Sequence, residues 1–382
     1  MRLLALSWCL WWLAPVISPA ASPPPSYPIG IYSVNSTNDL SMVKAAGFNL
    51  VSGSAAKSYL DAAQAAGLRV LAVPGTQAGS TFDPAAARRT VRALDKHPAL
   101  WAWYVVDEPD LNGIPPEAVF RANRILKAAG ARKPTALVLY RGYETLNYGN
   151  ITDIMLIDRY PIPWLPLANF GQHVGLARLG VGKDKPLVAI IQAFDWSIDA
   201  RELPGQKNLR PPTYEEMRCM TYEALARGAN GLFYYAFDAG WKMREHPDTW
   251  SALSRIIQEV NQRLPLFMAD HQWWAKNHTF GDPTKQYNAA LESSVTSCLL
   301  HVQKGNAQVP AGDYILAVNN TDQAQDYSFA IPAHQPSTLN PQPINVLDER
   351  RVIQPEASRL RDLFAPYDVH FYGPLSKMES RN

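Results

Sequence analysis

The 382-residue chain contains few of the residues that cross-link proteins or hold metals, with 3 cysteines and 8 histidines. Beyond residue 20 only Cys219 and Cys298 remain. Two cysteines can form at most one disulfide, which cannot stabilise a chain of this size alone, so the fold must depend on a hydrophobic core. They form either one disulfide or two buried free thiols. No spacing of Cys and His is typical of a zinc site, so we predict neither a metal nor a cofactor.

Charge is also scarce, since charged residues make up 18% of the chain and hydrophobic residues 47%. The 36 Lys and Arg nearly balance the 34 Asp and Glu, which leaves a formal net charge of +2. A disordered chain would be less apolar, and a nucleic-acid-binding protein would carry a clear basic excess. The composition therefore predicts a globular protein with a large core and no nucleic-acid partner, and it leaves the oligomeric state open.

Long hydrophobic runs are absent except at the N-terminus, where Arg2 is followed by the apolar run Leu3 to Leu13. This pattern predicts a signal peptide over residues 1–20 and a Pro-rich tether over 21–26, with an uncleaved anchor as the alternative. No other stretch approaches the roughly 20 apolar residues of a membrane-spanning helix. We therefore expect a secreted or periplasmic protein that does not contact the membrane once the signal is cleaved.

From residue 27 onward, short apolar runs alternate with stretches of helical periodicity. The apolar runs cover residues 29–34, 49–54, 69–75, 100–107, 135–141, 154–160, 187–194 and 232–238. The helical stretches cover residues 39–46, 58–66, 84–96, 116–129, 167–179, 214–227 and 251–264. Apolar strands that alternate with helices are typical of a parallel sheet covered by helices. We therefore predict a (β/α)8 TIM barrel over residues 27–267.

A doubly wound open sheet is the alternative fold for this region. It is disfavoured because no glycine-rich turn follows the first apolar run, where Tyr32-Ser33-Val34-Asn35 stands instead. After residue 268 the sequence changes to short segments of alternating hydrophobicity, separated by Asn, Asp, Gly and Pro. This pattern predicts a C-terminal antiparallel β-sandwich over residues 268–382.

Two adjacent carboxyl groups, Asp107 and Glu108, follow the fourth apolar run. The carboxyl ends of barrel strands are where this fold builds active sites. On a regular strand neighbouring side chains point to opposite faces, so a bulge or bend is needed to bring both into the mouth. Repulsion and desolvation then raise one pKa, which makes Glu108 our candidate general acid. The alternative is a helix cap or an ion pair with an arginine such as Arg141 or Arg159.

A family resemblance rests on the end of this run, which reads Trp103-Tyr104-Val105-Val106-Asp107-Glu108-Pro109. It resembles the Asn-Glu-Pro motif of clan A TIM-barrel glycoside hydrolases and, more closely, the Asp-Glu pairs of families 20 and 123. The resemblance covers the barrel, and this motif is its specific part. It implies that Glu108 protonates the glycosidic oxygen while Asp107 orients the substrate's 2-acetamido group, whose oxygen attacks the anomeric carbon.

The seventh apolar run departs from the clan A pattern, because Gln192 stands where those enzymes place a nucleophilic Glu. An amide cannot form a glycosyl ester, so three alternatives stay open. The sugar supplies the nucleophile, a carboxylate such as Asp158 or Asp238 completes the catalytic pair, or the barrel binds glycans without cleaving them. The separation of Asp158 from Glu108 would distinguish a retaining geometry, at about 5 Å, from an inverting one, at about 6.5 to 9.5 Å.

Other positions near the predicted strand ends carry rings, amides and charged groups of the kind that bind sugars. The candidates are Tyr32, Gln77, Tyr140, Arg141, Tyr160, Gln192, Tyr235 and Trp241. The sequence therefore predicts a secreted glycoside hydrolase that cleaves an O-glycosidic bond of an oligo- or polysaccharide. A non-catalytic glycan-binding barrel is the main alternative. A metal-dependent hydrolase built on Asp107, Asp158 and Asp238 is a weaker one, because histidine ligands are missing.

Overall fold

The computed structural model describes residues 26–199, 209–272, 294–331, 342–356 and 359–375. The predicted signal peptide and all but the last residue of the predicted tether lie outside this part of the chain. Within it, no helix combines the length and the apolar character needed to cross a bilayer.

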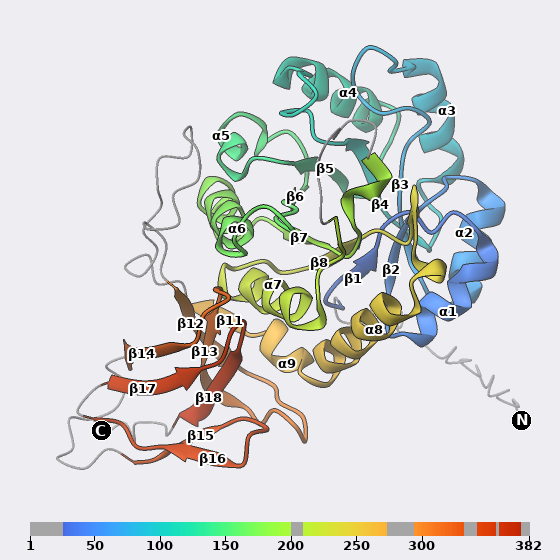
Figure 1. Ribbon diagram of the computed structural model, residues 1–382. Coiled ribbons are helices and arrows are strands. Elements are labelled where there is room, and N and C mark those ends of the chain that lie inside the picture. The colour runs from blue at the N-terminus through green and yellow to red at the C-terminus, as the bar shows by residue number, and fades with distance from the viewer. Residues whose placement is uncertain (1–25, 200–208, 273–293, 332–341, 357–358, 376–382) are drawn as a thin grey trace, which may run out of the picture.

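Eight parallel strands form a closed barrel in chain order, as predicted (Figure 1). The barrel closes where the first strand pairs with the eighth, with Gly30 opposite Phe233. The strands are β1 (Ile29–Ile31), β2 (Leu50–Gly53), β3 (Arg69–Ala72), β4 (Leu100–Val106), β5 (Thr135–Leu139), β6 (Ile154–Asp158), β7 (Leu187–Gln192) and β8 (Leu232–Tyr235).

The helices surround this barrel (Figure 1). They are α1 (Leu40–Ala45), α2 (Lys57–Ala65), α3 (Pro84–Leu94), α4 (Pro116–Ala128), α5 (Thr145–Tyr148), α6 (Ala168–Val181), α7 (Tyr214–Ala226), α8 (Pro247–Gln262) and α9 (Leu264–Phe267). Short 3-10 helices are η1 (Thr37–Asp39), η2 (Gly142–Glu144), η3 (Trp196–Asp199) and η4 (Met243–Glu245). The sequence explains several helix starts: Asp83 caps α3, and Thr213 and Glu216 form a capping box on α7.

Two features of the barrel were not predicted from the sequence. The short helix α5 lies between β5 and β6, and a hairpin of β9 (Asp238–Ala239) and β10 (Trp241–Lys242) follows β8. Both are too short to leave a periodic pattern in the sequence.

The C-terminal region contains two antiparallel sheets that pack as a sandwich, in agreement with the prediction. One sheet has the order β11-β12-β13-β18-β15-β16, and β14 pairs with β17 in the other. Side chains from both sheets share one hydrophobic core, which includes Leu299, Phe329 and Leu360. The strands are β11 (Asp270–Gln272), β12 (Val295–Val302), β13 (Gly312–Asn319), β14 (Gln325–Ala330), β15 (Ile344–Val346), β16 (Arg351–Ile353), β17 (Arg359–Phe364) and β18 (Val369–Leu375).

The six-stranded sheet is a middle layer between the barrel helices and the two-stranded sheet. Alternate residues of β12 divide accordingly, since Cys298 and Leu300 join the main core of the barrel while Leu299 joins the sandwich core. At this junction Glu223 and Arg227 of α7 form a buried ion pair, and Thr296 of β12 donates a hydrogen bond to Glu223. The C-terminal region is thus packed firmly against α7.

The two cysteines lie near this junction and form no disulfide. Both are buried free thiols, which is one of the two alternatives that the sequence left open. The Cys219 thiol donates a hydrogen bond to the Asn319 carbonyl at 3.4 Å.

Candidate active site

The side chains at the mouth follow from the alternation along each strand. Ile154 and Leu156 of β6 belong to the cluster inside the barrel, so Asp158, two residues further on, also faces the axis. The same alternation directs Tyr32 inward after β1 and Tyr235 inward at the end of β8. Polar inward positions are therefore concentrated at the carboxyl ends of the strands, where this fold builds its sites.

A bulge in β4 changes this alternation just before the two adjacent carboxyl groups. The pairing of β4 with β5 shifts in register between Tyr104 and Val106, and Glu108 takes a positive φ of 41°. A positive φ is uncommon for a residue with a side chain and often marks a functional position. The bend that the sequence required is therefore present, and it turns Glu108 toward the barrel axis.

Glu108 and Asp158 form a carboxyl pair across the mouth, in which each side chain affects the pKa of the other. Burial, followed by the negative charge of Asp107, raises the pKa of Glu108 to about 7. Burial and the charge of Glu108 raise the pKa of Asp158 well above its usual range. Among the described residues no N–H or O–H group donates to Oδ1 of Asp158. Burial and the neighbouring carboxyl groups therefore raise the pKa of both members of the pair.

Asp107 belongs to the same cluster but has a different partner. The Tyr104 hydroxyl donates a hydrogen bond to Oδ1 of Asp107, and the ring of Tyr32 lies 6.2 Å from the ring of Tyr104. Asp107 is exposed in the open mouth, yet the surrounding wall still desolvates its carboxylate and raises its pKa. Its negative charge is one cause of the raised pKa of Tyr32, after burial.

The capping and ion-pairing role that was the alternative for Asp107 and Glu108 belongs instead to Asp110. Its carboxylate accepts hydrogen bonds from the backbone N–H groups of Tyr140 and Arg141, at 3.1 and 2.8 Å. The guanidinium of Arg141 lies 4.0 Å from the same carboxylate. Asp110 and Tyr104 are members of the site that sequence reasoning missed. The only signal in the sequence was that both residues lie within three positions of Asp107.

Aromatic rings line the side of the mouth formed by β6, β7 and β8. The Tyr160 ring lies 5.6 Å from Tyr235 and 5.2 Å from Phe194. Further out, Trp196 lies 5.4 Å from Trp164, which is 41% exposed. These rings pack edge to face or tilted, and aromatic rings beside a carboxyl cluster can provide apolar faces for the C–H surfaces of sugar rings.

Gln192 lies at the end of β7 but has no polar atom directed to a ligand. Its Oε1 accepts from the Ile162 N–H at 2.9 Å, and its Nε2 donates to the carbonyls of Ile162 and Phe194 at 2.8 and 3.2 Å. The side chain is fully buried. Gln192 therefore holds the loop after β6 in place. Both polar atoms of its amide are engaged by the backbone, so neither is available for the substrate contact that the sequence predicted.

Trp241, Asp238 and Gln77 are also separate from the carboxyl cluster. Trp241 is 2% exposed, and one face of its indole stacks on His246 at 3.6 Å, so the predicted sugar platform is covered. Asp238 is half-buried in the β9–β10 hairpin, and no interaction within the described chain joins its carboxylate to Glu108. Gln77 is half-buried in the loop after β3. Where the structure describes the chain, no group of three acidic, His or Cys side chains is arranged to hold a metal ion.

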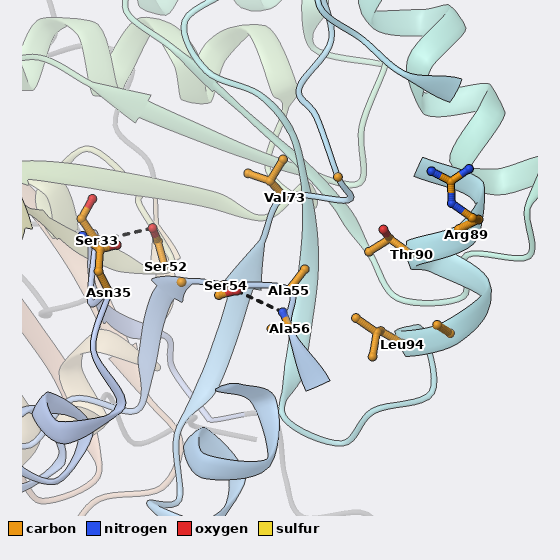
Figure 2. Close-up of a pocket in the computed structure, with 13 residues that line it drawn as sticks. Ser33, Asn35, Ser52, Ser54, Ala55, Ala56, Val73, Arg89, Thr90 and Leu94 are labelled. Carbon is orange, nitrogen blue, oxygen red and sulfur yellow. Dashed lines mark hydrogen bonds between the residues drawn. The ribbon is translucent and has the colours of Figure 1, made fainter. Parts of the chain in front are cut away.

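An open hollow of about 710 Å³ lies beside the mouth (Figure 2). Its lining comes from the segments that follow β1, β2 and β3 and from one face of α3. Figure 2 shows Ser33, Ser52 and Ser54 along one side and Arg89 and Thr90 on the other. No aromatic ring is among its lining residues. None of the residues that line this hydroxyl-rich hollow belongs to the carboxyl cluster.

Comparisons with solved structures support the fold. The chain resembles a structure described as a glycoside hydrolase, with a TM-score of 0.58, 11% identity, and 91% of this chain and 92% of that chain covered. It also resembles a family 5 glycoside hydrolase from Bacteroides vulgatus, with a TM-score of 0.57, 12% identity, and 91% and 89% covered. The protein AmyP in complex with maltose matches with a TM-score of 0.54, 9% identity and 90% of each chain covered.

No family model and no curated protein matches the sequence. At these identities the structural likeness establishes the barrel and its C-terminal sheets. The reaction must be argued from the site.

Proposed function

We propose that this protein is a glycoside hydrolase that cleaves an O-glycosidic bond in an oligo- or polysaccharide, with Glu108 as the general acid. The observation that carries the proposal is the carboxyl pair of Glu108 and Asp158 at the barrel mouth, with the pKa of Glu108 raised to about 7. A carboxyl group that keeps its proton near neutral pH can donate it to a departing glycosidic oxygen. The glycoside hydrolases among the structural neighbours are consistent with this reaction.

The carboxyl pair bears on the mechanism. An inverting enzyme leaves about 6.5 to 9.5 Å between its carboxyl groups for a water molecule, and a retaining enzyme about 5 to 5.5 Å for the anomeric carbon. Either role would need Asp158 in its ionised form, which burial and the charge of Glu108 disfavour.

A nucleophile supplied by the substrate resolves this difficulty. We propose retention by substrate assistance on an N-acetylhexosamine-containing glycan, in which the 2-acetamido oxygen attacks the anomeric carbon. Asp107, held by the Tyr104 hydroxyl, would orient the acetamido group and stabilise the positive charge that develops on it. We propose a location outside the cytoplasm for this activity, which the predicted leader over residues 1–20 supports.

The test uses an aryl N-acetylhexosaminide with the wild type, Glu108→Gln, and the control Glu117→Gln. Glu117 is an exposed residue of α4 outside the carboxyl cluster. We expect the wild type and the control to release the aryl alcohol, and Glu108→Gln to be slower by about 10²- to 10⁴-fold. The wild-type rate should decline above about pH 7, as Glu108 loses its proton.

A thiazoline that mimics the cyclised acetamido intermediate should inhibit the wild type competitively. Turnover that is indifferent to this inhibitor would reject substrate assistance while leaving hydrolysis intact. If the protein retains the glycan without cleaving it, the non-catalytic binding barrel is the better description. The absence of a carboxylate at the position of Gln192 is the specific observation that favours that alternative.

A further inference from the structure

Two arginines at the mouth, Arg141 after β5 and Arg159 after β6, share one aromatic ring. The guanidinium carbon of Arg159 lies 4.3 Å from the centre of the Tyr140 ring, and that of Arg141 lies 5.7 Å from it. Both guanidinium groups therefore contact the same aromatic ring. Burial, together with the charge of Arg141, lowers the pKa of Arg159. An arrangement that costs electrostatic energy indicates a use for both charges.

Their protein partners are mostly neutral. Nε of Arg159 donates to the side-chain oxygen of Asn169 at 2.7 Å. Nη1 of Arg141 donates to the backbone carbonyl of Asp110 at 2.6 Å, and its nearest carboxylate is 4.0 Å away. Within the part of the chain that the structure describes, the terminal nitrogens of Arg159 donate no hydrogen bond. Guanidinium groups bind carboxylate, sulfate and phosphate through such paired N–H donors.

The surroundings supply only part of the balancing negative charge, since the carboxylate of Asp110 lies 4.0 Å from Arg141. The ionised form of Asp158, the residue before Arg159, is disfavoured by burial and by the charge of Glu108. Asp110 is already engaged by two backbone N–H groups. His173, packed behind the arginines, accepts a hydrogen bond from the Gly142 N–H, and burial and both arginines lower its pKa to about 3, so it remains neutral.

We propose that Arg141 and Arg159 form a binding site for an anionic substituent, a carboxylate or a sulfate, on the sugar that is cleaved at Glu108. This inference rests on the proposed function and narrows its substrate class to acidic glycans. The fork of Arg159 pairs with two oxygens of the anion, Arg141 adds a second charge, and Tyr140 fixes both guanidinium groups.

The experiment compares three aryl glycosides that all carry a 2-acetamido group: a neutral N-acetylhexosaminide, its sulfated counterpart, and the corresponding 2-acetamido uronide. These distinguish a sulfate from a carboxylate. We expect kcat/KM of the wild type to favour one anionic substrate by about ten- to a hundredfold, the range of a charge-assisted contact. Arg159→Met and Arg141→Met should each reduce this ratio toward one, and Arg159→Lys should restore part of it. Higher salt should lower the rate on the anionic substrate more than on the neutral one.

Arg124→Met is the matched control, because Arg124 also stands over an aromatic ring, that of Phe120 on α4, at 5.9 Å. This variant should keep the kcat/KM of the wild type and its preference for the anionic substrate. Equal kcat/KM on neutral and anionic substrates, or a ratio unchanged in both Met variants, would overturn the inference. Thermal unfolding checks that the variants fold.

Binding measured by calorimetry on Glu108→Gln separates the two proposals. If no glycoside is cleaved, the proposed hydrolysis fails, and the affinity of this variant for sulfated, carboxylated and neutral sugars still decides the anion site. Tighter binding of an anionic sugar that is lost in Glu108→Gln/Arg159→Met supports the site. Equal affinity for all three sugars rejects it.

Discussion

Glu108 and Glu259 are both glutamates that the fold withdraws from water, and their pKa values move in opposite directions. Glu259 of α8 accepts hydrogen bonds from Arg218, Arg263 and Tyr222, and these partners hold its pKa below the usual value against the effect of burial. Glu108 faces other carboxyl groups, so burial and repulsion act together to raise its pKa. The comparison separates a carboxylate that stabilises the fold from one whose proton is available for chemistry.

The surroundings of the two residues explain the difference. Glu259 lies where α8 meets α7 and the C-terminal region, and Arg263 also binds Asp348 there at 2.9 Å. Each charge at this junction has an opposite charge beside it. At the mouth, Asp107, Glu108 and Asp158 come from two strands, and their mutual repulsion raises the pKa of Glu108 and of Asp158. Removing the negative charge of Glu259 should therefore destabilise the fold, whereas removing that of Glu108 should not.

The largest expected effect on stability is that of Glu259→Gln. The change leaves two arginines at the junction without their shared carboxylate, and breaking such a pair costs about 3 kcal/mol. This is the low end of the usual range, because the side chain is 16% exposed. Glu108→Gln should unfold no earlier than the wild type at pH 8, since the amide removes a carboxylate that repels its neighbours.

Denaturant unfolding at pH 8 measures both variants. The activity per folded molecule should be kept in Glu259→Gln and lost in Glu108→Gln. A similar loss of stability in both variants would remove the distinction between them.

The fold and part of this contrast can be read from the sequence. Eight apolar runs separated by helical stretches predicted the barrel, because strands covered by helices on the outside and packed inside must be apolar on both faces. The sequence also placed Asp158 and Glu108 at strand ends on the same edge of the sheet, but it left their separation open. The bend at Glu108 follows from the need to turn two neighbouring side chains to one side.

Other roles depend on contacts between distant segments, which the sequence does not specify. Gln192 is satisfied by the backbone of Ile162, 30 residues away, in a loop whose path no local pattern indicates. The burial of Trp241 depends on His246 and on a two-residue hairpin strand. The hydrogen bonds from Arg218 and Arg263 to Glu259 likewise require α7 and α8 to be packed side by side.

The second prediction concerns the pH dependence of stability, where the two glutamates should act in opposite senses. Glu108 has a folded pKa of about 7 against an ordinary value of 4.5. The folded protein therefore keeps a proton that the unfolded chain has lost, and this contribution is complete below about pH 4.5 and disappears as the pH rises to about 7. Glu259 has a lowered pKa in the folded protein, so its ionised form stabilises the fold at pH values above the ordinary pKa of Glu. This contribution is lost as the pH falls through the folded pKa.

Thermal unfolding from pH 4 to pH 8 tests this prediction. The midpoint of Glu108→Gln should rise relative to the wild type as the pH increases, whereas that of Glu259→Gln should fall relative to it. The exposed control Glu117→Gln should follow the wild type throughout. Parallel curves for Glu108→Gln and the wild type would mean that Glu108 titrates with an ordinary pKa in the folded protein.

The smallest expected effect is that of Asp107→Asn on the alkaline decline of activity. The charge of Asp107 is the second cause of the raised pKa of Glu108, after burial. The amide removes this charge while keeping a group of similar shape next to Tyr104. The pKa of Glu108 should fall, so the decline in kcat/KM should begin at a lower pH than in the wild type.

The size of the shift matters less than its direction, because substrate assistance also predicts a lower rate for Asp107→Asn at every pH. If Asp107→Asn lowers kcat but does not shift the pH at which activity declines, Asp107 acts on the acetamido group alone. If the decline of activity shifts to lower pH while kcat is nearly unchanged, Asp107 is a positioning residue that acts through Glu108. Both effects together are expected, since one carboxylate between Tyr104 and Glu108 can orient the substrate and hold the proton on its neighbour.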